Sequence, residues 1–224
     1  MAVHWAVFFN LMKTMNRRKF LKKSLYGAGG LGLLTGLYTW QVEPFWYEFV
    51  YHKMPIKNLP PELDGKRLIQ LSDIHVGDHL DNKHIKKAFE RTQKLEPDFV
   101  VYTGDFVSYK NNHQLERLKD VMQKAVLGTL GTAAVLGNHD YGTKWSEQKV
   151  ADGVTNILED VNIMVLINQE HNFNGLNIMG IDDYWSLNFH PEKVMTKFDD
   201  SKANLVLCHN PDVCDLDVWN GYQG

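Results

Sequence analysis

Four short polar clusters in this chain each follow an apolar run and carry side chains that bind metals. They are Asp73-Ile74-His75, Gly104-Asp105, Gly137-Asn138-His139-Asp140 and His209-Asn210. Carboxylate, carboxamide and imidazole groups together form the oxygen and nitrogen set that suits a pair of divalent transition metals. A pair of such ions is typical of enzymes that catalyse in-line displacement at phosphorus. The clusters therefore predict a dinuclear site and a hydrolytic reaction at a phosphate.

The residue types also predict how the site is divided between two ions. On an extended strand Asp73 and His75 project to the same side, so we expect both to hold the first metal. Asp105 has two carboxylate oxygens and can bridge two ions. Asn138 offers a neutral carbonyl oxygen and His209 an imidazole, and we expect both at the second metal.

His139 directly follows Asn138 and points elsewhere if Asn138 binds a metal. It then suits a catalytic role, in which it donates a proton to the leaving oxygen or stabilises charge at phosphorus. Asp140 either orients His139 or caps a turn, and the sequence leaves both readings open. Asp182 and Asp183 follow a strand outside the main alternation, and we interpret them as residues that stabilise a turn.

Between the clusters, apolar runs alternate with amphipathic segments, which predicts strands that alternate with helices. Such alternation implies a largely parallel sheet covered on both faces, with ligands bound at the carboxyl ends of its strands. We therefore expect the clusters to meet at one edge of the sheet. Asn174-Gly175 predicts a hairpin turn. The predicted strands span 67–72, 98–103, 132–136, 163–167, 176–181 and 203–208, and the predicted helices span 82–95, 113–127, 146–160 and 191–198.

The composition is that of a globular protein with one sizeable α/β domain in 224 residues. The net charge of −3 hides an asymmetry, since residues 1–40 carry six Lys or Arg and no acid, which leaves −3 − 6 = −9 for the rest. A net charge this negative over the rest of the chain argues against nucleic acid as a partner, because nucleic acid binds to basic surfaces. Two cysteines provide no disulfide framework. We expect a monomer.

The amino-terminal segment predicts export. A basic stretch at 16–22 precedes a weakly apolar, glycine-rich stretch at 24–40, as in an export signal. Arg17 and Arg18 resemble the twin-arginine motif, although Asn16 stands where Ser or Thr is usual. The twin-arginine export machinery is thus an expected partner, and an ordinary Sec signal or an uncleaved anchor is the alternative. Translation from Met15 would make residues 1–14 a start-site artefact.

These features divide the chain into a signal or anchor at 1–40, a linker at 41–65 and a catalytic domain at 66–224. The linker is rich in proline and aromatic residues, which either pack on the domain or lie at a membrane interface. We expect the protein in the periplasm or on the outer face of the cytoplasmic membrane. We expect the linker to contribute to association with that membrane.

The order and spacing of Asp-Ile-His, Thr-Gly-Asp-Phe, Leu-Gly-Asn-His-Asp and a later His resemble the calcineurin-like metallophosphoesterases over residues 66–224. With the leader, the resemblance narrows to exported phosphodiesterases with twin-arginine signals. It implies a four-layer α/β/β/α sandwich and a pair of Mn, Fe or Zn ions. It assigns Asp73 and His75 to the first metal, Asp105 to the bridge, Asn138 and His209 to the second metal, and His139 to the catalytic acid.

The chain departs from the family pattern at its end. The family carries a Gly-His-x-His motif with two further ligands, whereas this chain reads Gly-Tyr-Gln-Gly at 221–224. We therefore expect a sandwich truncated at the carboxyl terminus, five of seven metal ligands, and low activity of these 224 residues alone.

The leading hypothesis is hydrolysis of a phosphomonoester or phosphodiester by a dinuclear centre outside the cytoplasm. An alternative within the enzyme class is a hydrolase of lipid-linked pyrophosphates at the membrane surface. A third reading is a non-catalytic, truncated domain that binds metal.

Overall fold

The computed structural model describes residues 16–78 and 80–219, and the chain separates into two compact units, Met1–Val50 and Tyr51–Gly224. The first unit contains helix α1, Arg17–Gln41, and the 3₁₀ turn η2, Glu43–Phe45. Asn16 caps α1, because its Oδ1 accepts a hydrogen bond from the backbone N–H of Arg18. Among the described residues, no helix combines the length and the apolar character needed to cross a bilayer. The expected start-site artefact at 1–14 lies outside the described residues.

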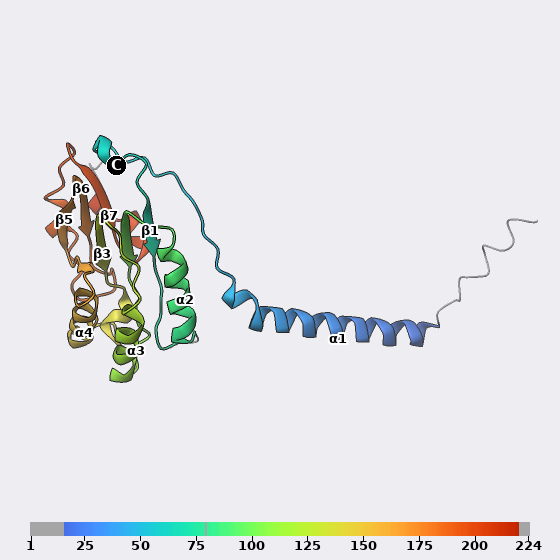
Figure 1. Ribbon diagram of the computed structural model, residues 1–224. Coiled ribbons are helices and arrows are strands. Elements are labelled where there is room, and N and C mark those ends of the chain that lie inside the picture. The colour runs from blue at the N-terminus through green and yellow to red at the C-terminus, as the bar shows by residue number, and fades with distance from the viewer. Residues whose placement is uncertain (1–15, 79, 220–224) are drawn as a thin grey trace, which may run out of the picture. The chain divides into compact units, whose positions relative to one another are not determined.

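The second unit contains two sheets. The first is parallel, in the order β1 (Leu68–Leu71), β2 (Phe99–Thr103), β3 (Gly131–Val135) and β4 (Met164–Val165). The second has the order β5 (Gln169–Phe173), β6 (Leu176–Gly180) and β7 (Ala203–Leu207), with β5 antiparallel and β7 parallel to β6. Figure 1 labels β1 and β3 of the first sheet and all three strands of the second.

The hairpin predicted at Asn174-Gly175 is confirmed, since these two residues join the antiparallel strands β5 and β6. Their φ angles of 54° and 98° are the left-handed values that a two-residue turn of this kind requires.

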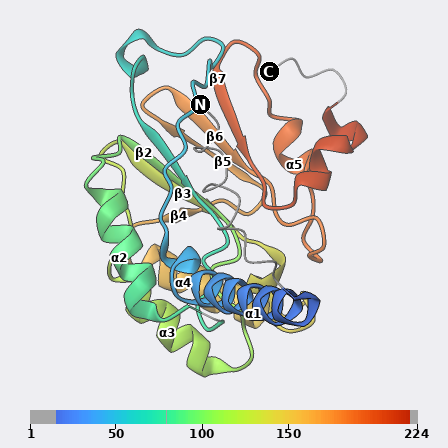
Figure 2. The same cartoon turned by 90° about the vertical axis from the view of Figure 1, so that its right-hand side faces the viewer.

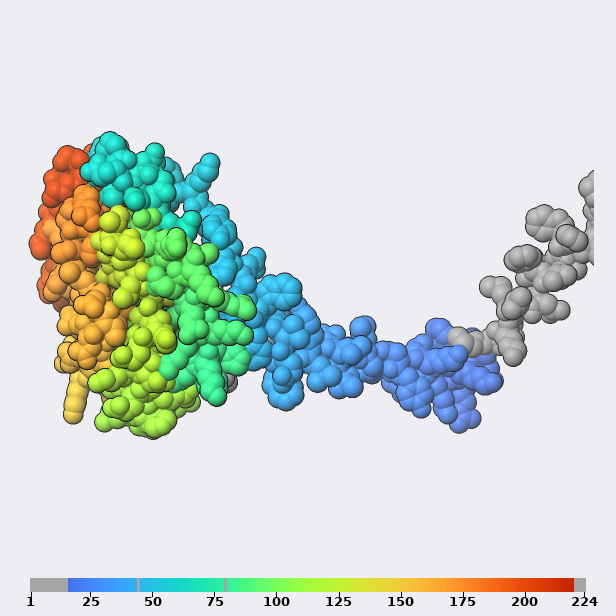
Figure 3. All heavy atoms as spheres, in the orientation of Figure 1, coloured from blue at the N-terminus to red at the C-terminus, as the bar shows by residue number. Residues whose placement is uncertain are grey.

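Three helices cover one face of the first sheet: α2 (Asn82–Gln93), α3 (Asn112–Met122) and α4 (Gln148–Glu159) (Figure 1). Neighbouring helices are in contact, and the green, yellow-green and orange surfaces of these segments lie next to one another in Figure 3. The second sheet lies on the opposite face (Figure 2). Strand β2 shows both layers, because Val100 and Tyr102 pack with the helices while Phe99 and Val101 pack with the second sheet. The short helix α5, Glu192–Met195, contacts β5. The structure is therefore a mixed α/β sandwich, as predicted.

Two predicted helix boundaries are wrong for identifiable reasons. Helix α3 ends at Met122 instead of residue 127, because the backbone of Val126 bonds the Tyr102 hydroxyl in both directions. Helix α4 begins at Gln148 instead of Ser146, because Glu147 turns back to accept hydrogen bonds from the backbone and hydroxyl of Thr143.

Candidate metal centre

The predicted site residues lie just beyond the carboxyl ends of four strands. Asp73 follows β1, Asp105 follows β2, the turn η4 (Asn138–Tyr141) follows β3, and His209 follows β7. The first three strands belong to the parallel sheet, whereas β7 belongs to the second sheet. The expectation of a single sheet edge is thus wrong for His209, which reaches the site across the interface between the two sheets.

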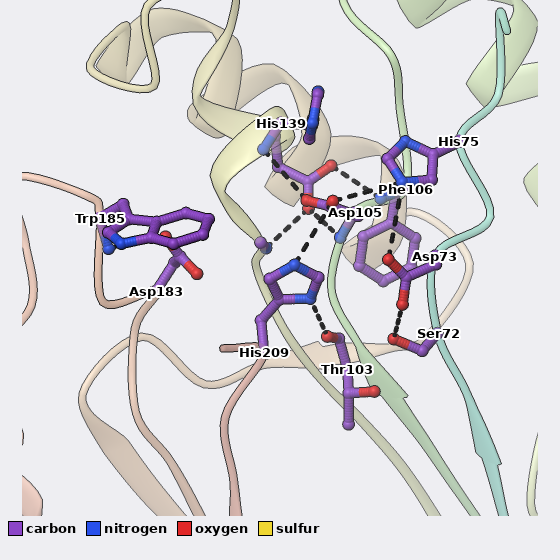
Figure 4. Close-up of polar contacts among 12 residues, drawn as sticks. Ser72, Asp73, His75, Thr103, Asp105, Phe106, His139, Asp183, Trp185 and His209 are labelled. Carbon is purple, nitrogen blue, oxygen red and sulfur yellow. Dashed lines mark hydrogen bonds and ion pairs between the residues drawn. The ribbon is translucent and has the colours of Figure 1, made fainter. Parts of the chain in front are cut away.

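Asp105 lies at the centre of the cluster (Figure 4). Its Oδ2 is 3.4 Å from Nε2 of His75 and 3.4 Å from Nε2 of His209. Its Oδ1 accepts a hydrogen bond of 3.0 Å from the backbone N–H of His139. Asp105 is only 3% exposed, so its carboxylate is held among these partners. One carboxylate therefore faces an imidazole on each side.

Asp73 lies beside this group, with Oδ1 at 3.6 Å from Nε2 of His75. The extended backbone that we expected here is wrong, because Asp73, His75 and Asp105 have φ angles of 55°, 46° and 56°. Residues other than glycine adopt the left-handed region uncommonly, although Asp and His do so more often than most. Such conformations persist where the surroundings impose them, commonly at functional sites. The backbone turns sharply after each strand and still brings the side chains together.

Hydrogen bonds on the far side of each imidazole orient the rings. Nδ1 of His75 is 3.0 Å from Oγ of Ser108, and Nδ1 of His209 is 2.7 Å from the carbonyl oxygen of Thr103. The carbonyl can only accept, so Nδ1 of His209 carries a hydrogen. In both rings this arrangement leaves Nε2 directed at Asp105, and it is the arrangement typical of histidines that bind metals.

The charges of the cluster depend on one another. Burial alone would raise the pKa of Asp105, but its hydrogen bond to His209 and the positive charge of that ring lower it below the ordinary value. Burial alone would lower the pKa of His209, but Asp105 and the Thr103 carbonyl raise it to about 9. His209 must therefore lose a proton before its Nε2 can coordinate a cation.

The turn η4 places three consecutive polar residues near Asp105. Asn138 is 4% exposed and Asp140 is fully buried. The ring of His139 packs edge-on against that of His75, with 5.0 Å between the centroids. The turn thus brings the predicted catalytic histidine beside a predicted ligand of the first metal.

The donor set fits divalent cations. Ligand atoms of Asp73, Asp105 and His209 all lie within 4.8 Å of one another. Two atoms that share one ion at about 2.1 Å each are roughly 3.0–3.4 Å apart, close to the distances from Asp105 to both rings. Carboxylate and imidazole ligands suit Mn, Fe and Zn alike.

Sequence reasoning left the role of Asp140 open, and the structure resolves it. Its two oxygens accept hydrogen bonds from the backbone N–H groups of Asp105, Phe106, Val107 and Gly137, at 2.9 to 3.2 Å. Burial and the charge of Asp105 raise the pKa of Asp140 to about 7, against the lowering effect of these N–H groups. Asp140 therefore ties the segment after β2 to the segment after β3. The signal available in the sequence was an acid two residues past the predicted ligand Asn138.

Residues 66–222 match the calcineurin-like phosphoesterase family, and the chain belongs to it. Members of this family are hydrolases that act on phosphoester bonds with a dinuclear metal centre. The predicted family is thereby confirmed.

Three relatives illustrate the range of the family around this chain. A metallophosphoesterase of Bacillus subtilis, YkuE, is 27% identical over 209 residues, covering 90% of this chain and 71% of its own length. The UDP-2,3-diacylglucosamine pyrophosphatase LpxG of Chlamydia trachomatis is 28% identical, covering 69% of this chain and 61% of its own length. The phosphodiesterase YaeI of Escherichia coli is 25% identical, covering 88% and 71%. The chain thus spans about two thirds of the length of these relatives.

Proposed function

We propose that this protein hydrolyses phosphoesters with a dinuclear metal centre in which Asp105 is the bridge. The observation that supports the proposal most directly is the position of Asp105 Oδ2, at 3.4 Å from the Nε2 atoms of both His75 and His209. One buried carboxylate facing ligands from two different sheets is the geometry that a shared bridging ligand needs.

In this proposal Asp73 and His75 hold the first ion, and Asn138 and His209 hold the second. Two divalent ions, most suitably Mn, Fe or Zn, supply the positive charge that offsets the phosphate and activates the attacking water. Asp105 is already held by the backbone N–H of His139, so its carboxylate needs no reorientation to serve both sides.

His139 is proposed to donate a proton from its imidazole to the leaving oxygen. Its ring contacts that of His75, so it lies beside the metal ligands and can reach a phosphate bound there. A positioned general acid of this kind contributes roughly 10²- to 10⁴-fold to the rate.

The test is hydrolysis of bis-p-nitrophenyl phosphate by the full-length gene product with added Mn. We expect metal-dependent turnover, its loss to the metal-free level in Asp105→Ala, and a fall of about 10²- to 10⁴-fold in His139→Ala. Asp160→Ala, an exposed acid at the end of α4, is the matched control and should retain full activity. Unchanged turnover in Asp105→Ala would rule out the two-metal assignment.

A second candidate function is hydrolysis of a lipid-linked pyrophosphate at a membrane surface. It is favoured by the similarity to LpxG, named as a UDP-2,3-diacylglucosamine pyrophosphatase, and by the exposed aromatic rings Trp46, Phe49 and Tyr51. Release of a nucleoside monophosphate from a lipid-linked nucleoside diphosphate in vesicles would support it, and turnover of soluble diesters alone would count against it. Metal binding without turnover of either substrate would favour the non-catalytic reading.

We also propose that the protein is exported through the twin-arginine pathway and works outside the cytoplasm. Arg17, Arg18 and Lys19 occupy the first turn of α1, where no acid is present. Positive charge is unfavourable at a helix amino terminus, so a role in recognition accounts for these residues better than helix stability does.

A further inference from the structure

Two exposed indole rings stack on each other beside the candidate metal centre. The centroids of Trp145 and Trp185 are 5.4 Å apart and their planes differ by 17°. The two side chains are 39% and 50% exposed, so large apolar faces remain open to solvent. The rings come from different segments, Trp145 from the stretch between η4 and α4 and Trp185 from the stretch between β6 and α5. We call this pair the tryptophan wall.

The tryptophan wall adjoins the proposed catalytic acid. The ring of Trp145 lies 6.1 Å from that of His139, centroid to centroid, and His139 in turn contacts His75. Figure 4 shows Trp185 and Asp183 on the side of the cluster where His209 lies. A group that leaves from phosphorus next to His139 would therefore lie against these rings.

Buried hydrogen bonds connect the segment that bears Trp185 to the turn η4. Asp182 accepts a hydrogen bond of 2.6 Å from the Tyr141 hydroxyl and one of 3.1 Å from the Ser186 hydroxyl. Asp183 accepts one of 2.9 Å from the backbone N–H of Trp185. Asp182 and Asp183 thus stabilise a turn, and that turn fixes Trp185 relative to the turn that carries His139.

The backbone at Trp145 is also imposed by its surroundings. Its φ angle is 53°, in the left-handed region that a large side chain seldom adopts. Its N–H donates to the carbonyl of Gly142, and Glu147 accepts hydrogen bonds from Thr143 in the same turn. A strained conformation that places an indole in solvent beside the catalytic acid is better explained by binding than by folding.

We propose that the tryptophan wall binds a planar ring of the substrate, so that the site prefers phosphoesters of nucleosides or of aryl alcohols. The inference rests on the proposed function of the same site. Aromatic rings attract one another most strongly in offset-stacked or edge-on arrangements, which a flat ring can adopt against an exposed indole face. Stacking of a base on an aromatic side chain changes affinity by roughly 5- to 150-fold.

Matched pairs of ligands that differ in the ring alone test this proposal. Phenyl phosphate is compared with methyl phosphate, and uridine monophosphate with ribose 5-phosphate, by calorimetry on the Mn-loaded, full-length gene product. Trp185→Ala should weaken the ring-bearing member of at least one pair by at least about fivefold and the other member by less than about twofold. Trp185→Phe should restore most of the affinity, because it retains a ring.

Leu187→Ala removes an even more exposed apolar side chain, 74% against 50% for Trp185, from the same segment and should change neither pair. A thermal melt of each variant shows that it is folded. Loss confined to uridine monophosphate identifies a nucleobase as the preferred ring, and loss confined to phenyl phosphate identifies an aryl group.

Equal weakening of both members of each pair, or no change, would overturn the proposal. So would an equal loss for hexyl phosphate, because the wall would then respond to apolar bulk and not to planarity. Calorimetry does not need turnover, so ring-dependent binding without hydrolysis would refute the proposed function and leave this inference standing. Hydrolysis without ring-dependent binding would refute this inference and leave the proposed function standing.

Discussion

The carboxylate of Asp140 is fully buried and accepts hydrogen bonds from neighbouring backbone, and these bonds hold the position of Asp105. Both of its oxygens accept two backbone N–H groups, from the segments after β2 and β3. A buried N–H that loses its acceptor costs about 1–3 kcal/mol. The geometry of the proposed metal ligand Asp105 therefore depends on a residue whose role the sequence left open.

Asp140→Asn tests this role without creating a cavity. The amide has the same shape, but its NH₂ group faces two backbone N–H donors and cannot accept from them. We expect the free energy of unfolding, measured in urea, to fall by about 2–5 kcal/mol. Asp160→Asn, at an exposed site, should change it by less than about 0.5 kcal/mol. Equal stability of the two variants would show that the four hydrogen bonds contribute little.

At the scale of elements, the order of strands and helices could be predicted because hydrophobic periodicity records burial directly. The parallel sheet and the strand ends that precede Asp73 and Asp105 follow from that periodicity, and the hairpin follows from the turn residues Asn174 and Gly175. The end of α3 could not be predicted, because it depends on the Tyr102 hydroxyl, which lies 24 residues away in sequence from its partner Val126. A hydrogen bond between residues far apart in the chain leaves no pattern in the local amino-acid sequence.

The close approach of the strand ends explains two glycines that sequence reasoning recorded only as parts of motifs. A Cβ at Gly137 would lie 2.2 Å from Oδ1 of Asp105, and one at Gly104 would lie 2.9 Å from Nδ1 of His209. Larger residues at these two positions would push the proposed ligands Asp105 and His209 apart. The chemical types of the site residues were readable from the sequence, whereas this spacing and the left-handed backbone at Asp73, His75 and Asp105 required the structure.

At the scale of the whole molecule, the two compact units differ in charge. The first unit carries six Lys or Arg against Glu43 and Glu48, a net charge of 6 − 2 = +4, which leaves −3 − 4 = −7 for the second. The proposed export signal lies in the first unit. The structure describes each unit, and the division into a leader and a catalytic domain stays a prediction. The direct test of the proposed leader is a measurement of export.

Fusion of residues 1–65 to a reporter that is active only outside the cytoplasm tests the leader. We expect export to fall to background when Arg17 and Arg18 are both replaced by Lys, since the twin-arginine machinery reads the arginine pair and not charge alone. The control replaces Lys22 and Lys23 by Arg, which preserves charge and should preserve export. Undiminished export of the Arg17→Lys, Arg18→Lys variant would point to the Sec pathway.

The central claim is that Asp105 joins two metal ions in one site. Electron paramagnetic resonance of the Mn-loaded, full-length gene product, with the Mn content measured on the same sample, tests it most directly. We predict two Mn ions per chain with the spectrum of an exchange-coupled pair, and loss of the coupling in Asp105→Ala. Two uncoupled ions in the unmodified protein, or a coupled pair that survives Asp105→Ala, would contradict the account.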